Sequence, residues 1–268
     1  MSGQILPWSH LKTTDFASLD PARTIALLPV GAVEQHGPHL PLGTDTIILE
    51  ALIARLAPHL PDALTVLVLP TQAVGDSLEH SDFDGTLSHA AESLIDSWTT
   101  LGRAVASTGL TKMAIVNSHG GQPQIVDIVA QRLRHECGLL AARIKSYRLG
   151  TPDGAFDADE LAYGYHGGEV ETSLMLAIAP ELVAMDKAQD FDTLARRMAQ
   201  DNQVFQVEGS AGFAWAAQDL NGAGAMGNAA AADALRGERT LALMAERLAI
   251  ALGEIADFPM DHLADGPA

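Results

Sequence analysis

Short apolar runs that alternate with long amphipathic stretches constrain the fold of this chain more than any other feature. Four runs rich in Val, Ile and Leu occur at residues 24–30 (TIALLPV), 64–69 (LTVLVL), 112–116 (KMAIV) and 140–147 (LAARIKSY). Such runs are typical of strands buried on both faces of a parallel sheet. The stretches 45–56, 89–107 and 122–136 have helical periodicity, with Asp45 or Thr46 and Ser88 as N-caps. The pattern predicts a three-layer α/β/α fold with a mostly parallel central sheet.

The second half of the chain begins with a change in composition. Residues 151–168 (TPDGAFDADELAYGYHGG) are rich in Gly, Asp and Tyr, and they predict a loop long enough to have a function or to act as a lid. A helix is expected over residues 169–179, before Pro180, and an Ala-rich helix over residues 228–257. Because no repeat or linker divides the sequence, we expect a single domain over residues 1–268.

Charge and composition exclude several classes of protein. The 268 residues, 47% of them hydrophobic, are enough to bury a sizeable core. A net charge of −18, from 34 acidic and 16 basic residues, repels nucleic acid and anionic membranes. No apolar run approaches the ~20 residues of a spanning helix, and no signal peptide is evident. Cys137 is the only cysteine, so we expect a buried inert thiol in a cytoplasmic enzyme.

The first candidate motif, PVGAVEQHGPHLPLGTDT at residues 29–46, follows the first apolar run. Glu34 and His36 are two residues apart, so their side chains project to the same side of an extended chain. Asp45 begins the next predicted helix, where its carboxylate is able to bridge two cations. Taken singly, Glu34 fits a surface acid, His36 a loop histidine, and Asp45 an N-cap. Their clustering at a strand end favours a ligand site.

The second motif, VNSHGGQ at residues 116–122, follows the third apolar run in the same way. If both strands end at one edge of the sheet, His119 reaches the ions held by the first motif. Gly120 and Gly121 allow close approach of a ligand to the backbone. By itself this motif is more typical of a turn histidine than of a metal ligand.

The third motif, YHGGEVETSLMLA at residues 165–177, places His166 before two acids, Glu169 and Glu171. Acids in the first turn of a helix are favoured by the helix dipole, which is the purely structural interpretation. The functional alternative is a carboxylate that completes a divalent metal site, with an imidazole beside it for proton transfer.

Together these acids and histidines form an N/O ligand set without thiolate, which suits Zn, Mn or Fe(II). A bridging aspartate favours two ions, with a water of lowered pKa between them and a polarised carbonyl. This is the chemistry of amide hydrolysis.

Three segments, EQHGPHLPLGTD, NSHGGQ and HGGEVETSLML, closely resemble in order and spacing the creatininase family of amidohydrolases. The resemblance extends into FAWAAQDLNGAGAMGNAAAADALRGERTL, which is similar to the family's pocket loop and closing helix. It implies a single α/β domain, a dinuclear metal centre with Zn the leading metal, and frequent hexameric assembly.

The resemblance also implies roles for individual residues. Glu34 and His119 are expected to hold one ion and His36 the other, with Asp45 bridging them. Glu169 is expected to complete the second ion's shell, as a residue of both the metal site and the catalytic machinery. His166 corresponds to the histidine that carries protons to the leaving nitrogen. Glu171 is expected to have a structural role, because two positions along a helix turn it away from the face of Glu169.

Differences from the creatinine-hydrolysing members bear on the substrate. Those members carry a Tyr and a Glu where this chain has Gly120 and Gly121, and a pocket Trp near Ala162 and Tyr165. Creatinine is therefore not the expected substrate. Gly120, Gly121, Tyr165 and Trp215 remain candidate substrate contacts, Phe213 a second candidate pocket wall, and His80 a candidate for the entrance or an oligomer contact.

We expect a metal-dependent amidohydrolase that acts on a C–N bond of a small cyclic amide, a formamide or a similar substrate. The alternatives are a peptidase that trims a short precursor peptide, a non-catalytic metal-binding subunit, and a one-metal isomerase or lyase.

Overall fold

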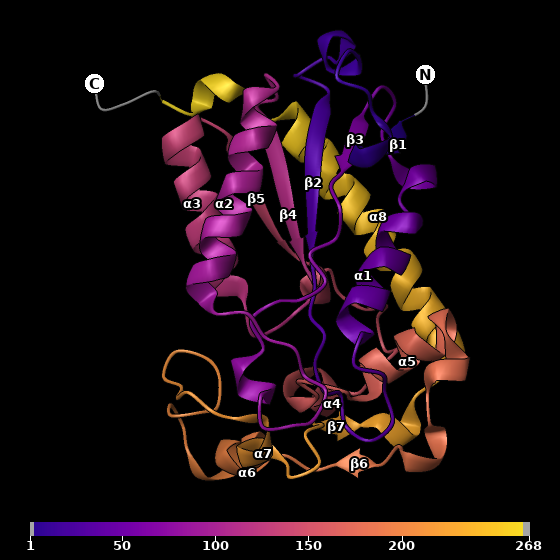
Figure 1. Ribbon diagram of the computed structural model, residues 1–268. Coiled ribbons are helices and arrows are strands. Elements are labelled where there is room, and N and C mark those ends of the chain that lie inside the picture. The colour runs from indigo at the N-terminus through magenta and orange to yellow at the C-terminus, as the bar shows by residue number, and fades with distance from the viewer. Residues whose placement is uncertain (1–2, 265–268) are drawn as a thin grey trace.

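A five-stranded parallel sheet forms the centre of the computed structural model, which describes residues 3–264 (Figure 1). Its strands are β1 (Gln4–Pro7), β2 (Thr24–Val30), β3 (Thr65–Val68), β4 (Lys112–Asn117) and β5 (Leu140–Lys145), in the order β1-β3-β2-β4-β5. All four neighbouring pairs are parallel. The predicted parallel sheet is confirmed. The edge strand β1 was not predicted, because its four residues, QILP, are too few to form a distinct apolar run.

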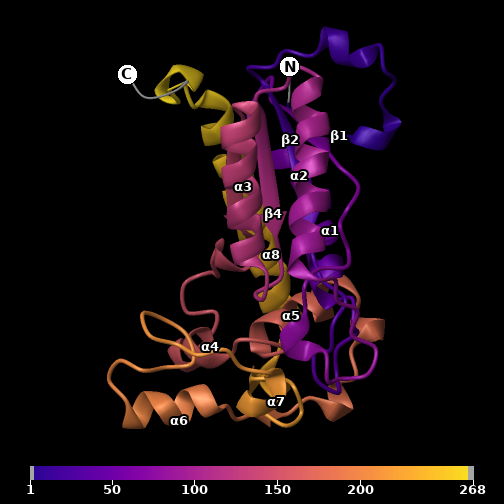
Figure 2. The same cartoon turned by 60° about the vertical axis from the view of Figure 1, so that its left-hand side comes forward.

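Helices cover both faces of the sheet, as the α/β/α prediction requires. In Figures 1 and 2, α2 (Ala91–Ser107) and α3 (Pro123–Cys137) lie side by side on one face. The other face is covered by α1 (Thr44–Ala54), α5 (Glu169–Ile178) and α8 (Ala234–Asp257).

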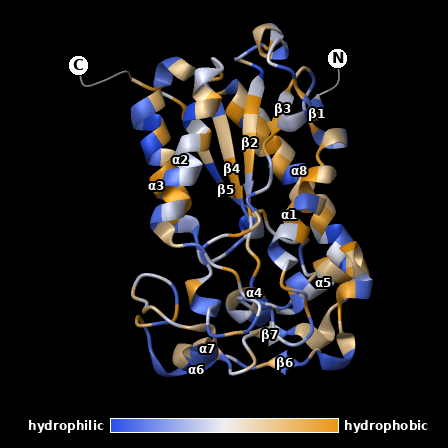
Figure 3. Cartoon of the chain, in the orientation of Figure 1, coloured by the Kyte–Doolittle hydropathy of each residue, from blue (hydrophilic) through white to orange (hydrophobic). Residues whose placement is uncertain are grey.

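Residues of β2 alternate between the two cores, because successive strand side chains point to opposite faces. Ile25 and Leu27 join the core with α1, α5 and α8, whereas Ala26 and Leu28 join the core with α2 and α3. The apolar colouring of β2 and β4 in Figure 3 reflects burial on both sides. This two-sided burial explains why the strands have continuous apolar sequences.

Smaller elements gather at the end of the molecule opposite the two termini (Figure 1). They are α4 (Ala158–Tyr163), α6 (Leu194–Asp201), α7 (Ala217–Leu220), and a two-stranded antiparallel ribbon of β6 (Asp190–Phe191) and β7 (Gly227–Asn228). Within residues 3–264, no helix combines the length and the apolar character needed to cross a membrane.

The predicted N-caps are wrong. Helix α1 begins after Gly43, so Asp45 lies inside the first turn, and α2 begins after Ala90. The Ser88 hydroxyl instead accepts a hydrogen bond from the Ser77 N–H at 2.9 Å. The C-terminal helix starts at Ala234, not 228, because Asn228 pairs in β7 and Asp233 caps the helix by accepting from the Arg236 N–H.

Candidate metal centre

The candidate site lies where the winding of the sheet changes direction. The chain passes from β2 to β3 on one side, and then from β3 to β4 on the other side of β2. The segments after β2 and β4 therefore lead to helices on opposite faces, α1 and α3, and leave a crevice where ligands of open α/β sheets bind. Glu34 and His36 follow β2, and His119 follows β4.

The backbone around His119 is held by Asn117, the last residue of β4. Asn117 Oδ1 accepts from the His119 N–H at 3.0 Å, and Asn117 Nδ2 donates to the His119 carbonyl at 2.8 Å. Gln122 Nε2 donates to the same Oδ1 at 3.0 Å and to the Gly31 carbonyl at 3.1 Å. These bonds join the ends of β4 and β2 and fix the position from which His119 projects.

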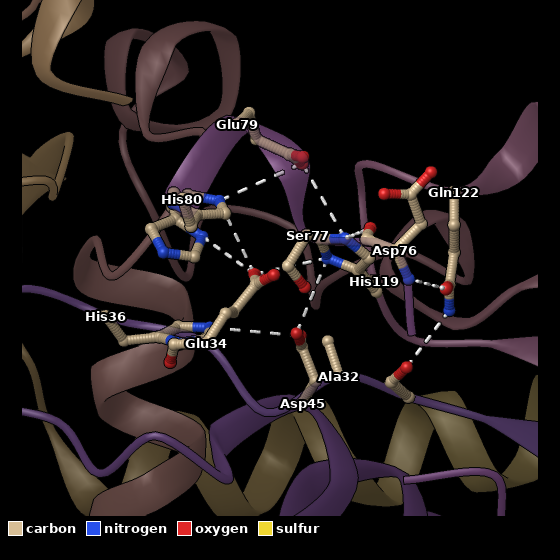
Figure 4. A network of polar contacts seen from close by, with 12 residues as sticks. Ala32, Glu34, His36, Asp45, Asp76, Ser77, Glu79, His80, His119 and Gln122 are labelled. Atoms are coloured by element: carbon tan, nitrogen blue, oxygen red, sulfur yellow. Dashed lines mark hydrogen bonds and ion pairs between the residues drawn. The ribbon is translucent and has the colours of Figure 1, made fainter. Parts of the chain in front are cut away.

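Four of the predicted ligands converge in this crevice (Figure 4). His119 Nδ1 lies 3.1 Å from Glu34 Oε1 and 3.6 Å from Asp45 Oδ2. His36 Nε2 lies 3.9 Å from Asp45 Oδ1. All four side chains are buried, with Glu34 and His36 at 0% exposure.

Three groups of side chains have ligand atoms within 4.8 Å of one another. They are Glu34 with Asp45 and His119, His36 with Asp45 and Glu171, and Glu34 with His36 and His166. Asp45 belongs to the first two groups, so its carboxylate stands between them. The arrangement is able to hold two ions that share Asp45.

Unpaired buried atoms indicate that the site fits a cation. Among the described residues, both carboxylate oxygens of Glu34, Oδ2 of Asp45 and Nε2 of His36 are buried without a hydrogen bond. Buried carboxylates without partners are costly, and buried charges are normally paired or coordinate metals. Carboxylate and imidazole donors without thiolate suit Zn, Mn or Fe(II).

The close approach of buried acids and imidazoles shifts the pKa values of Asp45, Glu34 and His119. Burial and the neighbouring Glu34 carboxylate raise the pKa of Asp45 well above its ordinary value. Burial acts in the same direction on Glu34, but His119 and His80 outweigh it and lower the pKa of Glu34 well below the usual range. For His119, burial is outweighed by Glu34 and Asp45, which raise the pKa to about 10. A divalent ion would replace these protons as the compensating charge.

Backbone carbonyls orient two of the imidazoles. His36 Nδ1 lies 3.0 Å from the Glu34 carbonyl, and His119 Nε2 lies 2.8 Å from the Asp76 carbonyl. A carbonyl oxygen only accepts hydrogen bonds, so each of these nitrogens carries the proton. The other nitrogen of each ring, His36 Nε2 or His119 Nδ1, then faces the cluster as a possible ligand atom.

The structure does not bring Glu169 into the cluster, contrary to expectation. Its carboxylate accepts a hydrogen bond from Arg236 of α8, on the side of α5 away from the cluster. Glu171 is grouped instead with His36 and Asp45. Glu171 Oε2 also accepts from the Gly167 N–H at 2.6 Å, which fixes the turn before α5. The two acids point in different directions, Glu171 toward His36 and Asp45 and Glu169 toward Arg236.

Two further histidines, His166 and His80, lie against the cluster. His166 packs against His36, with ring centroids 4.0 Å apart and the rings tilted by 32°, and its Nδ1 lies 3.7 Å from Glu34 Oε1. Burial lowers the pKa of His166 to about 4. His80 is buried rather than at an entrance, with Nε2 3.5 Å from Glu34 Oε1 and Nδ1 2.7 Å from Gln35 Nε2. No local signal in the sequence distinguishes His80 from a loop histidine.

The expected substrate contacts are exposed or half-buried. Gly120 and Gly121 are exposed, and a Cβ at position 121 would come within 1.9 Å of Glu79 Oε1 and 2.6 Å of His119 Nε2. Tyr165 is 37% exposed. Trp215 and Phe213 pack on the small apolar cluster of Ala195, Val207, Leu220 and Met226, and Trp215 Nε1 donates to Glu208 at 3.3 Å. Packing on this cluster therefore explains the partial burial of both aromatic side chains.

A parallel α/β sheet with buried carboxylates and imidazoles at its switch point defines a candidate metal-binding enzyme. The sequence model described as "Creatininase: Creatinine amidohydrolase" matches residues 9–252. The chain therefore belongs to the creatininase family.

Named relatives differ in activity. A mycofactocin precursor peptide peptidase of Mycolicibacterium smegmatis is 35% identical over 181 residues, which cover 67% of this chain and 68% of the relative. A creatinine amidohydrolase of Pseudomonas putida is 28% identical over 183 residues, covering 62% and 68%. Among solved structures, a mutant creatininase of the Zn-Zn type has a TM-score of 0.76 at 21% identity, covering 94% of this chain and 98% of that chain. This last likeness confirms the fold. Membership of the family confirms a metal-dependent amidohydrolase.

Proposed function

We propose that the chain hydrolyses an amide C–N bond with two divalent ions that share Asp45. The observation that carries the proposal is the pair of ligand groups, Glu34 with Asp45 and His119, and His36 with Asp45 and Glu171, which have one carboxylate in common. Ions held by these residues would supply a water of lowered pKa and would polarise the amide carbonyl. Zn is the leading metal, with Mn or Fe as alternatives.

The residues of the chain then have separate tasks. Glu34, His36, Asp45, His119 and Glu171 hold the ions. His166, whose Nδ1 lies 3.7 Å from Glu34 Oε1, is proposed to pass a proton to the leaving nitrogen. Its Nε2 lies 2.5 Å from the Gln35 carbonyl, which leaves Nδ1 facing the cluster. The residues that we propose to contact substrate are Tyr165, Trp215, Gly120 and Gly121.

Two substrate classes are compatible with this chemistry. The first is a small cyclic amide or formamide, which contains no ordinary peptide bond. The second is a short precursor peptide, and the 34–35% identity to mycofactocin precursor peptide peptidases favours it. A panel of cyclic amides, formamides and short peptides, assayed after reconstitution with Zn, Mn or Fe(II), distinguishes them.

Metal analysis tests the site independently of substrate. The wild-type protein, stripped and reloaded with Zn, is expected to retain two equivalents, and Asp45→Ala is expected to lose both. Retention of two equivalents by Asp45→Ala would contradict the bridging role. Retention without hydrolysis of any panel member would favour a non-catalytic metal-binding subunit instead.

We further propose one domain over the whole chain and a cytoplasmic homo-oligomer, with a hexamer expected from the family resemblance. The lone Cys137 supports a reducing compartment. Light scattering of the purified protein measures its mass in solution.

A further inference from the structure

A small pocket opens onto the ligand group of His36, Asp45 and Glu171. It has a volume of about 60 Å³, and Asp45 and Glu171 form part of its wall. These are the two carboxylates grouped with His36. A substrate whose amide lies at this group therefore has the pocket directly beside it.

Aliphatic side chains from three helices form one part of the pocket wall. Ile48 comes from α1, Leu174 from α5 and Met244 from α8. All three belong to the core between these helices and the sheet. The rim is formed by Tyr147 and Thr151, which belong to the segment after β5.

The polar groups of the pocket are hydroxyls and the two carboxylates. Among the described residues that line it, none is Lys, Arg or His. The hydroxyl of Ser118 is buried without a hydrogen-bond partner within residues 3–264. Ser118 precedes His119 and lines the pocket, so this unused hydroxyl is available to a polar atom of the substrate.

We propose that this pocket binds a neutral aliphatic substituent of the substrate, next to the amide that is hydrolysed. This inference rests on the proposed function and narrows its substrate class. A charged substituent of either sign would lose its hydration against Ile48, Leu174 and Met244. An apolar cavity of ~150 Å³ holds benzene, so this smaller pocket suits about two to four carbons rather than an aromatic ring.

Hydroxamates with increasing alkyl chains provide the test, because the hydroxamate binds the metal and the chain explores the pocket. Two series are needed, straight-chain acyl hydroxamates and N-alkyl formohydroxamates, since the substituent could be attached on either side of the amide. Binding to the Zn-loaded protein is measured by calorimetry. In one series the affinity is expected to rise about fourfold for each buried methylene, and to stop rising once about four carbons are present. A terminal carboxylate on the chain is expected to abolish the gain.

Variants separate the pocket from the metal site. Thr151→Phe adds bulk at the rim and is expected to remove the chain-length gain, while affinity for the shortest hydroxamate and the Zn content stay unchanged. Asp153→Phe adds the same bulk to an exposed position of the same loop and serves as the matched control. Met244→Ala enlarges the pocket and is expected to shift the optimum to longer or branched chains.

The outcomes distinguish the two proposals. Failure of the wild-type protein to retain Zn contradicts the proposed function. Zn retention and hydroxamate binding without a chain-length gain in either series would overturn the pocket assignment alone. A gain that persists in Thr151→Phe would also overturn it.

Discussion

Glu169 and Glu171 are two residues apart on α5, and this separation gives them different environments. At 3.6 residues per turn, two positions correspond to more than half a turn of the helix. Glu171 therefore lies with His36 and Asp45, whereas Glu169 pairs with Arg236 of α8. Glu169 therefore connects α5 to α8, and Glu171 belongs to the proposed metal site.

Substitution of Glu171 is expected to weaken metal binding, whereas substitution of Glu169 is expected to lower the free energy of unfolding. Glu171→Gln should weaken the second ion by about 100-fold or more, since an amide does not supply the negative charge. Glu169→Ala should keep both ions but lower the free energy of unfolding by about 1–3 kcal/mol, because it removes the charged acceptor of Arg236. Metal analysis and chemical denaturation of both proteins measure this. Metal loss in Glu169→Ala alone would reverse the assignment.

His39 provides a pH-dependent contribution to stability outside the proposed ligand set. Its ring is 1% exposed, stacks on Phe191, and lies 2.9 Å from the Thr172 hydroxyl through Nε2. Burial lowers the pKa of His39 to about 4. In the unfolded chain the pKa of His39 is near 6.5. Between pH 4 and pH 6.5, His39 therefore carries a proton in the unfolded chain but not in the folded protein. The stabilisation is complete above pH 6.5 and is lost as the pH falls toward 4.

The variant His39→Gln removes this titration while its amide remains able to reach Thr172. The difference in unfolding free energy between wild type and His39→Gln is expected to shrink by about 1.4 kcal/mol per pH unit below pH 6.5. Denaturation of both proteins at pH 7, 6 and 5 checks it, since the other titrating groups are common to both. A difference that is constant with pH contradicts the prediction.

How far the site could be predicted depends on how each residue is positioned. Glu34, His36 and His119 follow neighbouring strands, so the strand-end rule was sufficient to bring them together. His80 and Glu171 are placed by packing between segments far apart in the chain. Gln35, the partner of His80, is 45 positions away, and Arg236, which holds Glu169, is 67 positions away. Sequence spacing contains no signal for such contacts.

At the level of elements, α5 begins without a side-chain cap of its own. Its N-cap residue is Gly168, and the carboxylate of Glu160 from α4 takes the capping role. Glu160 Oε1 accepts from the Glu169 N–H at 2.7 Å, and Oε2 accepts from the Asn228 N–H at 2.8 Å. A Cβ at Gly168 or Gly227 would come within 2.3 or 2.7 Å of this carboxylate. The two glycines therefore leave the space in which Glu160 fixes α5 against β7.

Loss of this carboxylate is expected to loosen α5. Glu160→Ala leaves two backbone N–H groups without an acceptor and should lower the free energy of unfolding by about 1–3 kcal/mol. Glu160→Gln, whose single carbonyl oxygen can satisfy one of them, should lose less. Because α5 carries Glu171, metal affinity should fall in the same order. Denaturation and metal titration of the three proteins measure both effects. Wild-type stability in Glu160→Ala would contradict the capping role.

At the level of the whole molecule, the α/β/α layers were predictable from the sequence, but the order of the strands within the sheet was not. Continuous apolar runs and helical periodicity were sufficient for an α/β/α sandwich, because both are local patterns. The strand order depends on which strands pair, and the edge strand β1 pairs with β3 some sixty residues later, at Gln4 with Thr65. The switch at β2 that creates the crevice follows from that order.

The position of the site at this switch makes the ions part of the stability of the whole protein. Segments after β2, β4 and the start of α5 meet at Glu34, His119 and Glu171, and the acids among them repel one another without a cation. An ion that binds only the folded chain stabilises it by about 2.7 kcal/mol at 100 times its Kd. Chelation should therefore lower the unfolding temperature of wild type markedly. Asp45→Ala, which lacks the shared ligand, should show almost no response to the chelator. Calorimetric scans with and without EDTA, followed by Zn addition, measure both proteins, and an equal shift in the two would mean that the stabilising ions bind elsewhere.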